Sequence, residues 1–132
     1  MTHGLLLKKD EPIYQGQVSG RCPSKKNTKK VVRRYGRTMV IYSAQFREWE
    51  TRALVELRQT WNGKTIDQPL EAVFRFYFKN RQAESDLSNV IEAPQDALTK
   101  AGVIIDDKII QVIHATKIFG HEPRVEIELR HI

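Results

Sequence analysis

The segment from Leu70 to Lys79 alternates strictly between two kinds of side chain, and this constrains the fold most. Every second position is small or aromatic and apolar, and the set is Ala72, Phe74, Phe76 and Phe78. A period of two places this set on one face of a β-strand, so the segment belongs to a sheet with one buried face. Such a face needs a cover, which amphipathic helices can supply.

Two segments have the three- and four-residue apolar spacing of a helix. The first follows Ser43, a residue type favoured as a helix N-cap, and stops at Asn62-Gly63. Its stripe is Phe46, Trp49, Ala53, Leu54, Leu57 and Trp61. We expect this stripe to face the core, and a base-stacking surface is the alternative. The second helix runs over about 88–101, and Pro94 should kink its first half or delay its start.

Short β-rich segments surround these elements. Residues 31–34 and 38–42 are separated by Tyr35-Gly36-Arg37, which predicts a hairpin with Gly36 at positive φ. Residues 15–19 are a weak strand after a loosely ordered amino end over residues 1–14. The last two strands are expected at 109–119 and 124–130. The order predicts a single α+β domain over residues 1–132, a β-hairpin-α-β-α-β-β chain in which two main helices cover a mixed β-sheet.

Composition argues for the cytoplasm. The single cysteine, Cys22, cannot form an internal disulfide, which suits a reducing compartment. The run Leu5-Leu6-Leu7 is too short for a signal-peptide core, and no apolar stretch approaches the length of a membrane span. We therefore expect a cytoplasmic protein that makes no contact with a membrane.

The positive charge is concentrated in one segment. The formal net charge is +6, yet eight of the 22 cations lie between Arg21 and Arg37 with no acid among them. Such a segment commonly contacts a nucleic-acid backbone, and a solvated loop is the alternative. The expected DNA contacts are Lys25, Lys26, Lys29, Lys30, Arg33, Arg34, Arg37 and Tyr35.

Carboxylates occur before, within and after the second predicted helix, at Asp86, Glu92 and Asp106-Asp107. That helix is about 20 Å long, and the steps from Gly102 to Asp107 cover about 16 Å, so the acids could share one patch. Carboxylates in a patch repel one another unless a cation joins them, and Mg²⁺ prefers such hard ligands. Phosphodiester hydrolysis is the chemistry that follows. The alternatives are a helix cap, a solvated helix residue and a turn.

The run from Asp86 to Leu98, followed by residues 102–107, resembles the RusA-type Holliday junction resolvases, and the similarity extends loosely over residues 21–130. The resemblance implies a small homodimeric endonuclease of DNA recombination and repair, often from phages or prophages. It implies symmetrical cutting of four-way or branched DNA with Mg²⁺ or Mn²⁺ and without a small-molecule cofactor. The alternative is a non-catalytic or weakly catalytic structure-selective nucleic-acid-binding protein.

The resemblance also assigns residues. Asp86 is similar to the family's first catalytic aspartate, Asp107 to its last, and Asp106 to the acid before it. Ser88 stands where the family usually has a second aspartate, and Glu92 stands where it usually has a lysine. Glu92 could restore an anionic ligand on the same helical face. The candidate catalytic residues are Asp86, Asp107, Glu92 and Ser88, and the candidate metal ligands are Asp86, Asp107, Glu92 and Asp106. For Asp96, four residues after Glu92, we expect a helix-face or structural role.

Overall fold

Four strands form the main sheet of the computed structural model, which describes residues 11–24 and 29–132. The sheet order is β1-β6-β4-β5. The strands are β1 (Pro12–Ser19), β4 (Leu70–Phe78), β5 (Ile110–Phe119) and β6 (Arg124–His131). β6 lies antiparallel to β1 and to β4, whereas β5 lies parallel to β4. The predicted mixed sheet in an α+β domain is therefore confirmed.

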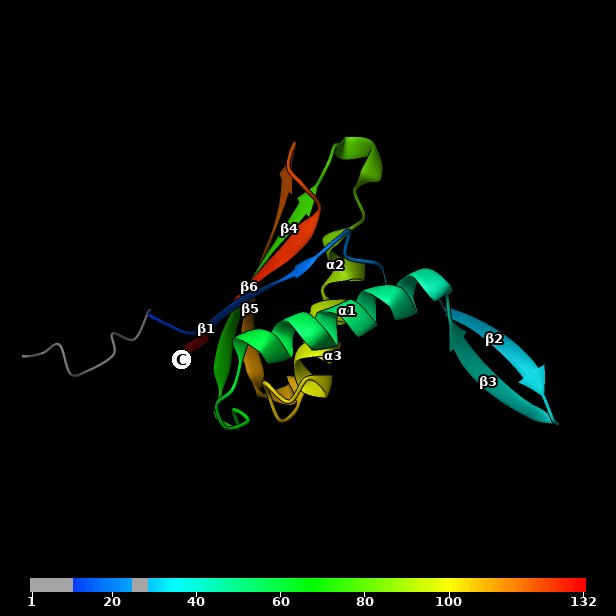
Figure 1. Cartoon of the computed structure of the whole chain (residues 1–132), viewed down its shortest axis with the longest axis horizontal. Helices are drawn as coiled ribbons and strands as arrows, with labels where there is room; N and C mark the ends of the chain where they lie inside the picture. The colour runs from blue at the N-terminus through cyan, green and yellow to red at the C-terminus, as the bar shows by residue number, and fades with distance from the viewer. Residues whose placement is uncertain (1–10, 25–28) are drawn as a thin grey trace, which may run out of the picture.

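Helices cover one face of this sheet (Figure 1). α1 (Ala44–Thr60) packs against β1 and α3 (Glu92–Lys100), and α2 (Leu87–Val90) precedes α3. Ser43 caps α1, as predicted, because its hydroxyl accepts a hydrogen bond from the Phe46 N–H at 3.1 Å. The predicted stripe supplies the buried residues Phe46, Trp49, Ala53 and Leu57. The base-stacking alternative for this stripe is therefore wrong.

The alternation of β4 separates an apolar face from a polar one. Ala72, Phe74, Phe76 and Phe78 are buried, as predicted. On the open face, Glu128 accepts hydrogen bonds from Arg75 at 3.0 Å and from Arg130 at 2.6 Å. Burial alone would raise the pKa of Glu128, but these two guanidinium groups outweigh it and hold the pKa below its usual range. Charged pairs thus connect neighbouring residues on the open face of the sheet.

The amino-terminal strand is longer than predicted. β1 begins at Pro12, so the expectation of a loosely ordered end was wrong for residues 12–14. Tyr14 is buried, and its hydroxyl lies 2.7 Å from the Thr60 hydroxyl at the end of α1. A Cβ on Gly16 would overlap the Tyr14 hydroxyl, so glycine makes room for the ring. This packing across elements is what extends the strand.

The predicted hairpin is confirmed, but it is a separate two-stranded sheet of β2 (Lys29–Arg34) and β3 (Arg37–Tyr42). It projects away from the rest of the domain (Figure 1). Arg37 pairs with Arg34, so it begins β3 and the turn is only Tyr35-Gly36. Gly36 has φ 73°, as predicted. Lys25 and Lys26 lie outside the described residues.

The second predicted helix is interrupted where the proline demands it. α2 ends at Val90 and α3 begins at Glu92. Pro94 has no N–H to donate to the carbonyl of Val90, four residues earlier. The buried Cys22 thiol takes that place, with Sγ 3.7 Å from the Val90 oxygen. The predicted effect of Pro94 is thus confirmed.

Within residues 11–24 and 29–132, no helix is both long enough and apolar enough to cross a membrane.

Candidate functional site

The predicted acids lie along the crossover that joins the parallel strands β4 and β5. The chain leaves β4 at Phe78 and passes through α2 and α3. It then enters β5 through a single 3₁₀ turn, η3 (Asp107–Ile109). Asp86 immediately precedes α2, and Asp107 opens η3. The two acids therefore lie near the two ends of one crossover.

Asp86 presents an exposed carboxylate. It occupies the N-cap position of α2, where its backbone carbonyl accepts hydrogen bonds from the N–H groups of Asn89 and Val90 at 3.0 and 3.2 Å. Its side chain makes no capping hydrogen bond. Asp86 is thus the N-cap residue of α2 by position, but its carboxylate does not take part in the cap.

The loop before Asp86 is held at two points. Glu84 forms an ion pair with Lys117 of β5 at 2.7 Å. Ser85 lies 3.4 Å from a guanidinium nitrogen of Arg21, the first cation of the basic segment. These contacts fix the approach to Asp86 and bring an arginine to the residue beside it.

The pair Asp106-Asp107 divides into two roles. The Asp106 carboxylate accepts a hydrogen bond from the Lys108 N–H at 3.1 Å and caps η3, so the turn alternative describes this residue. That bond, together with one to the Asp107 side chain, lowers the pKa of Asp106. The hydrogen bond with Asp106 raises the pKa of Asp107, and slight desolvation of this exposed residue and the negative charges of Asp106 and Asp96 raise it further.

The chain path explains why the charge of Asp96 acts on Asp107. After α3, residues 103–105 do not run freely back along the helix, because they are bonded beside Ile66. The Ile105 N–H donates to the Ile66 carbonyl, and the Ile66 N–H donates to the Val103 carbonyl, both at 2.9 Å. Asp107 therefore lies close enough to Asp96, a residue of α3, for the two charges to interact.

The expected single patch of Asp86, Glu92 and Asp107 is not assembled in this chain. Across residues 11–24 and 29–132, no three His, Cys, Asp or Glu side chains are grouped so as to hold a metal ion. Ser88 and Glu92 are exposed, in α2 and at the start of α3. The helix-face or structural role of Asp96 stays a prediction, and its negative charge acts on Asp107.

The cationic candidates that can be located lie at the hairpin tip. Arg33, Arg34, Tyr35 and Arg37 are all exposed. Lys29 and Lys30 begin β2, and their side chains lie outside the described part of the structure. The tip is thus an accessible basic surface that projects from the domain.

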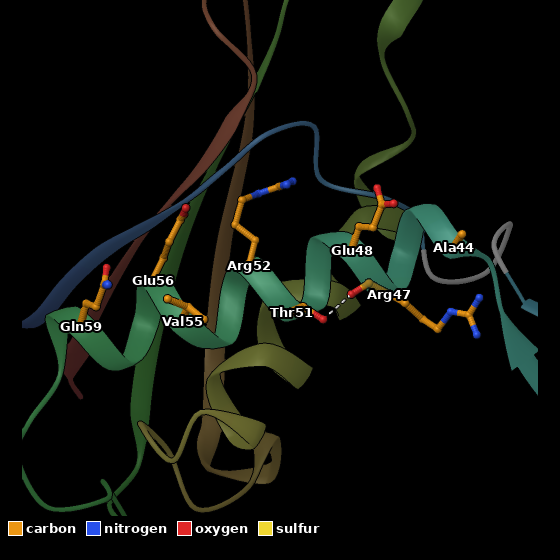
Figure 2. Close-up of a pocket in the computed structure, with 8 residues that line it drawn as sticks. All are labelled: Ala44, Arg47, Glu48, Thr51, Arg52, Val55, Glu56 and Gln59. Atoms are coloured by element: carbon orange, nitrogen blue, oxygen red, sulfur yellow. Dashed lines mark hydrogen bonds between the residues drawn. The ribbon is translucent and has the colours of Figure 1, made fainter.

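A hollow of about 720 Å³ runs along the outer face of α1 (Figure 2). Figure 2 shows its lining side chains, among them Arg52 and Glu56. The Arg52 Nε donates to the Ser19 carbonyl at 3.0 Å, and the two Glu56 oxygens accept from the Ser19 N–H and hydroxyl at 2.7 Å. These polar groups anchor the end of β1, and none of the residues that line the hollow is a predicted site residue.

Comparison with known proteins places the chain in a family. The sequence profile described as endodeoxyribonuclease RusA matches residues 21–130, the range over which the resemblance was expected. The crossover junction endodeoxyribonuclease RusA of Aquifex aeolicus (strain VF5) is 35% identical over 69 residues. That alignment covers 52% of this chain and 54% of the relative, so the chain matches about half of the relative's length.

Proposed function

This chain belongs to the RusA family of endodeoxyribonucleases, and on that premise we propose that it is a metal-dependent endonuclease that cuts four-way or otherwise branched DNA. The observation that carries the proposal is the acidic crossover on the same domain as a projecting cationic hairpin. The first suits phosphodiester hydrolysis, and the second suits the phosphate backbone. We propose a cytoplasmic role in DNA recombination and repair.

The carboxylates fit a hard divalent cation, Mg²⁺ or Mn²⁺. The hydrogen bond with Asp106 raises the pKa of Asp107, and the negative charges of Asp106 and Asp96 raise it further, so a bound cation would relieve the repulsion there. Mg²⁺ is usually held by only one or two carboxylates, with water and substrate phosphate in its other positions. We assign Asp107 and Asp96 as its first ligands and keep Asp86, Glu92 and Asp106 as predicted ligands. When bound, the metal would activate water and neutralise charge on the phosphate.

The chain's own groups supply the remaining steps. The exposed Asp86 carboxylate is available to orient the attacking water and accept its proton. Ser88 can hold a water molecule by its hydroxyl, and Glu92 adds negative charge nearby. Arg21, held beside Ser85, can bind the phosphate that is cut and so offset the absence of a lysine at position 92.

We also propose a homodimer with two-fold symmetry, because two symmetrical cuts need two active sites and one 15.3 kDa domain provides one. The outer edge of β5 is the surface on which we expect the two copies to meet. β5 is ten residues long without proline or glycine, and Val112 and Ile113 are 39% and 36% exposed. The opposite edge strand, β1, contains Pro12 and Gly16, which discourage pairing. We expect β5 to pair with β5 of a second copy.

A non-catalytic or weakly catalytic DNA-binding protein is the second candidate. Two observations favour it: Ser88 and Glu92 replace residues that the family usually has, and the described residues contain no group of three metal-binding side chains. This alternative explains the basic hairpin equally well. It does not explain why Asp86 is exposed or why negative charges lie close to Asp107.

Cleavage of a labelled synthetic four-way junction separates the two functions. With Mg²⁺ or Mn²⁺, we expect paired nicks that Asp86→Asn and Asp107→Asn each abolish. Glu48→Gln, on the outer face of α1, is the matched control and should cut like the unaltered protein. Junction binding without any cut, even in Mn²⁺, would leave the binding protein as the function.

A further inference from the structure

Tyr35 occupies a turn position that suits few residues. It has φ 55° and is followed by Gly36 at φ 73°, so both central residues of the hairpin turn lie in the left-handed region. Two-residue turns of this kind strongly favour Asn-Gly, because a bulky side chain is sterically disfavoured at positive φ. The turn would form more readily with asparagine than with tyrosine at position 35.

The steric cost of this conformation is not offset by burial of the Tyr35 ring. Tyr35 is 99% exposed. The hairpin that bears it is a separate sheet that projects from the domain (Figure 1). The ring therefore contributes nothing to the core, and its large aromatic surface faces solvent.

The arginines on either side of the Tyr35 turn also lower the stability of the free protein. Arg34 and Arg37 are direct cross-strand partners on the two sides of the turn, and like charges in that position repel. Arg33 is exposed one pair further along. A partner with closely spaced negative charges and a flat apolar face would relieve the repulsion and cover the ring. Nucleic acid has both, because its phosphates bind arginine and its bases stack on aromatic rings.

We propose that Tyr35 stacks on a base exposed at the branch point of DNA, and that this contact gives the protein its preference for branched over duplex DNA. The inference rests on the proposed function. In a continuous duplex each base pair is covered on both faces by its neighbours, so the ring has no free face to contact. At a branch point stacking is interrupted, and a base can present its face. The arginines bind phosphates in either kind of DNA.

The variant Tyr35→Asn tests this cleanly, because asparagine suits the turn and the hairpin should remain folded. We expect its affinity for a four-way junction to fall by about tenfold or more, while its affinity for duplex is unchanged. Tyr35→Phe keeps the ring and should retain the preference. Arg33→Gln is the matched control and should weaken binding to junction and duplex alike, because it removes a phosphate contact.

A direct readout is the fluorescence of 2-aminopurine placed next to the branch point. Unaltered protein and Tyr35→Phe should change this fluorescence, and Tyr35→Asn should not. If Tyr35→Asn keeps both the junction preference and the fluorescence change, the stacking assignment is wrong while the proposed function stands. If unaltered protein binds neither junction nor duplex, the proposed function fails with it.

Discussion

At the scale of single residues, Asp107 has surroundings that differ from those of an ordinary surface acid. Asp106 and Asp96 raise its pKa, so the folded protein holds a proton there more tightly than the unfolded chain does. Ionised Asp107 therefore lowers stability at neutral pH, and this loss disappears as the pH falls through the raised pKa. A bound divalent cation would reverse the effect at neutral pH.

Thermal unfolding with and without Mg²⁺ checks this account of Asp107. Without divalent cations, Asp107→Asn should raise the free energy of unfolding slightly, by less than about 0.5 kcal/mol because the site is exposed. Mg²⁺ should raise the melting temperature of the unaltered protein more than that of Asp107→Asn. As the solution is acidified, the rise in melting temperature caused by Mg²⁺ should weaken. Because the pKa of Asp107 is raised, this should happen at a higher pH than it would with an ordinary aspartate. Equal Mg²⁺ shifts in both proteins would contradict the assignment.

Cys22 has a structural task that its sequence context does not reveal. Its buried thiol lies against the Val90 carbonyl, and burial raises the pKa of the thiol well above the physiological range. A thiolate is the reactive form, so native Cys22 should react with a disulfide reagent such as DTNB only as fast as the protein unfolds. Rapid labelling of the native protein at pH 8 would contradict this.

Residue types alone predicted the Ser43 cap and the positive φ of Gly36, because both depend on local chemistry. The partnership of Asp96 with Asp107 was not predictable in this way. It depends on the bonds between Ile66 and residues 103–105, which are brought together only by the folded chain. The helix-face or structural role of Asp96 stays a prediction, to which the folded chain adds an interaction with the charge of Asp107.

At the scale of elements, the projecting hairpin is the part whose role can be measured by itself. Arg33, Arg34 and Arg37 are exposed at its tip. Each phosphate contact contributes about 0.9 to the slope of log affinity against log salt concentration. Replacing all three arginines with glutamine should therefore weaken DNA binding and reduce that slope by up to about 2.7. An unchanged slope in a salt titration of binding would show that these arginines do not contact phosphates.

The sequence predicted elements well wherever one periodicity dominated. The alternation in β4 and the stripe of α1 are buried as expected, and Pro94 marks the break before α3. The start of β1 was missed because Tyr14 is held by Thr60 at the far end of α1. The sequence did not indicate whether the hairpin joins the main sheet, because its residue pattern is the same in either arrangement.

At the scale of the whole molecule, the parallel pairing of β4 with β5 decides where the acids lie. It requires a long crossover, and that crossover contains Asp86, Asp96 and Asp107. Residue spacing bounded how far the chain could travel between these acids, but it could not give the path. The expected single patch is therefore replaced by an exposed Asp86 near one end of the crossover and the pair Asp106-Asp107 near the other.

The β5 edge gives the whole-molecule account a test in solution. Ile113→Lys places a charge on this edge and should shift the protein from dimer to monomer in analytical ultracentrifugation. Gln15→Lys, on the opposite edge strand β1, is the matched control and should leave the dimer intact. A dimer that survives Ile113→Lys would place the interface elsewhere.

The most direct test of the central claim uses a supercoiled plasmid that extrudes a cruciform, in other words a four-way junction. A dimer that cuts two strands symmetrically in one binding event converts this plasmid to the linear form. We predict linear product that requires Mg²⁺ or Mn²⁺, that is absent with Asp107→Asn, and that does not form from a plasmid without the cruciform. Product that is only nicked circle, or no product at all with either metal, would contradict the claim that this chain is a junction-cutting endonuclease.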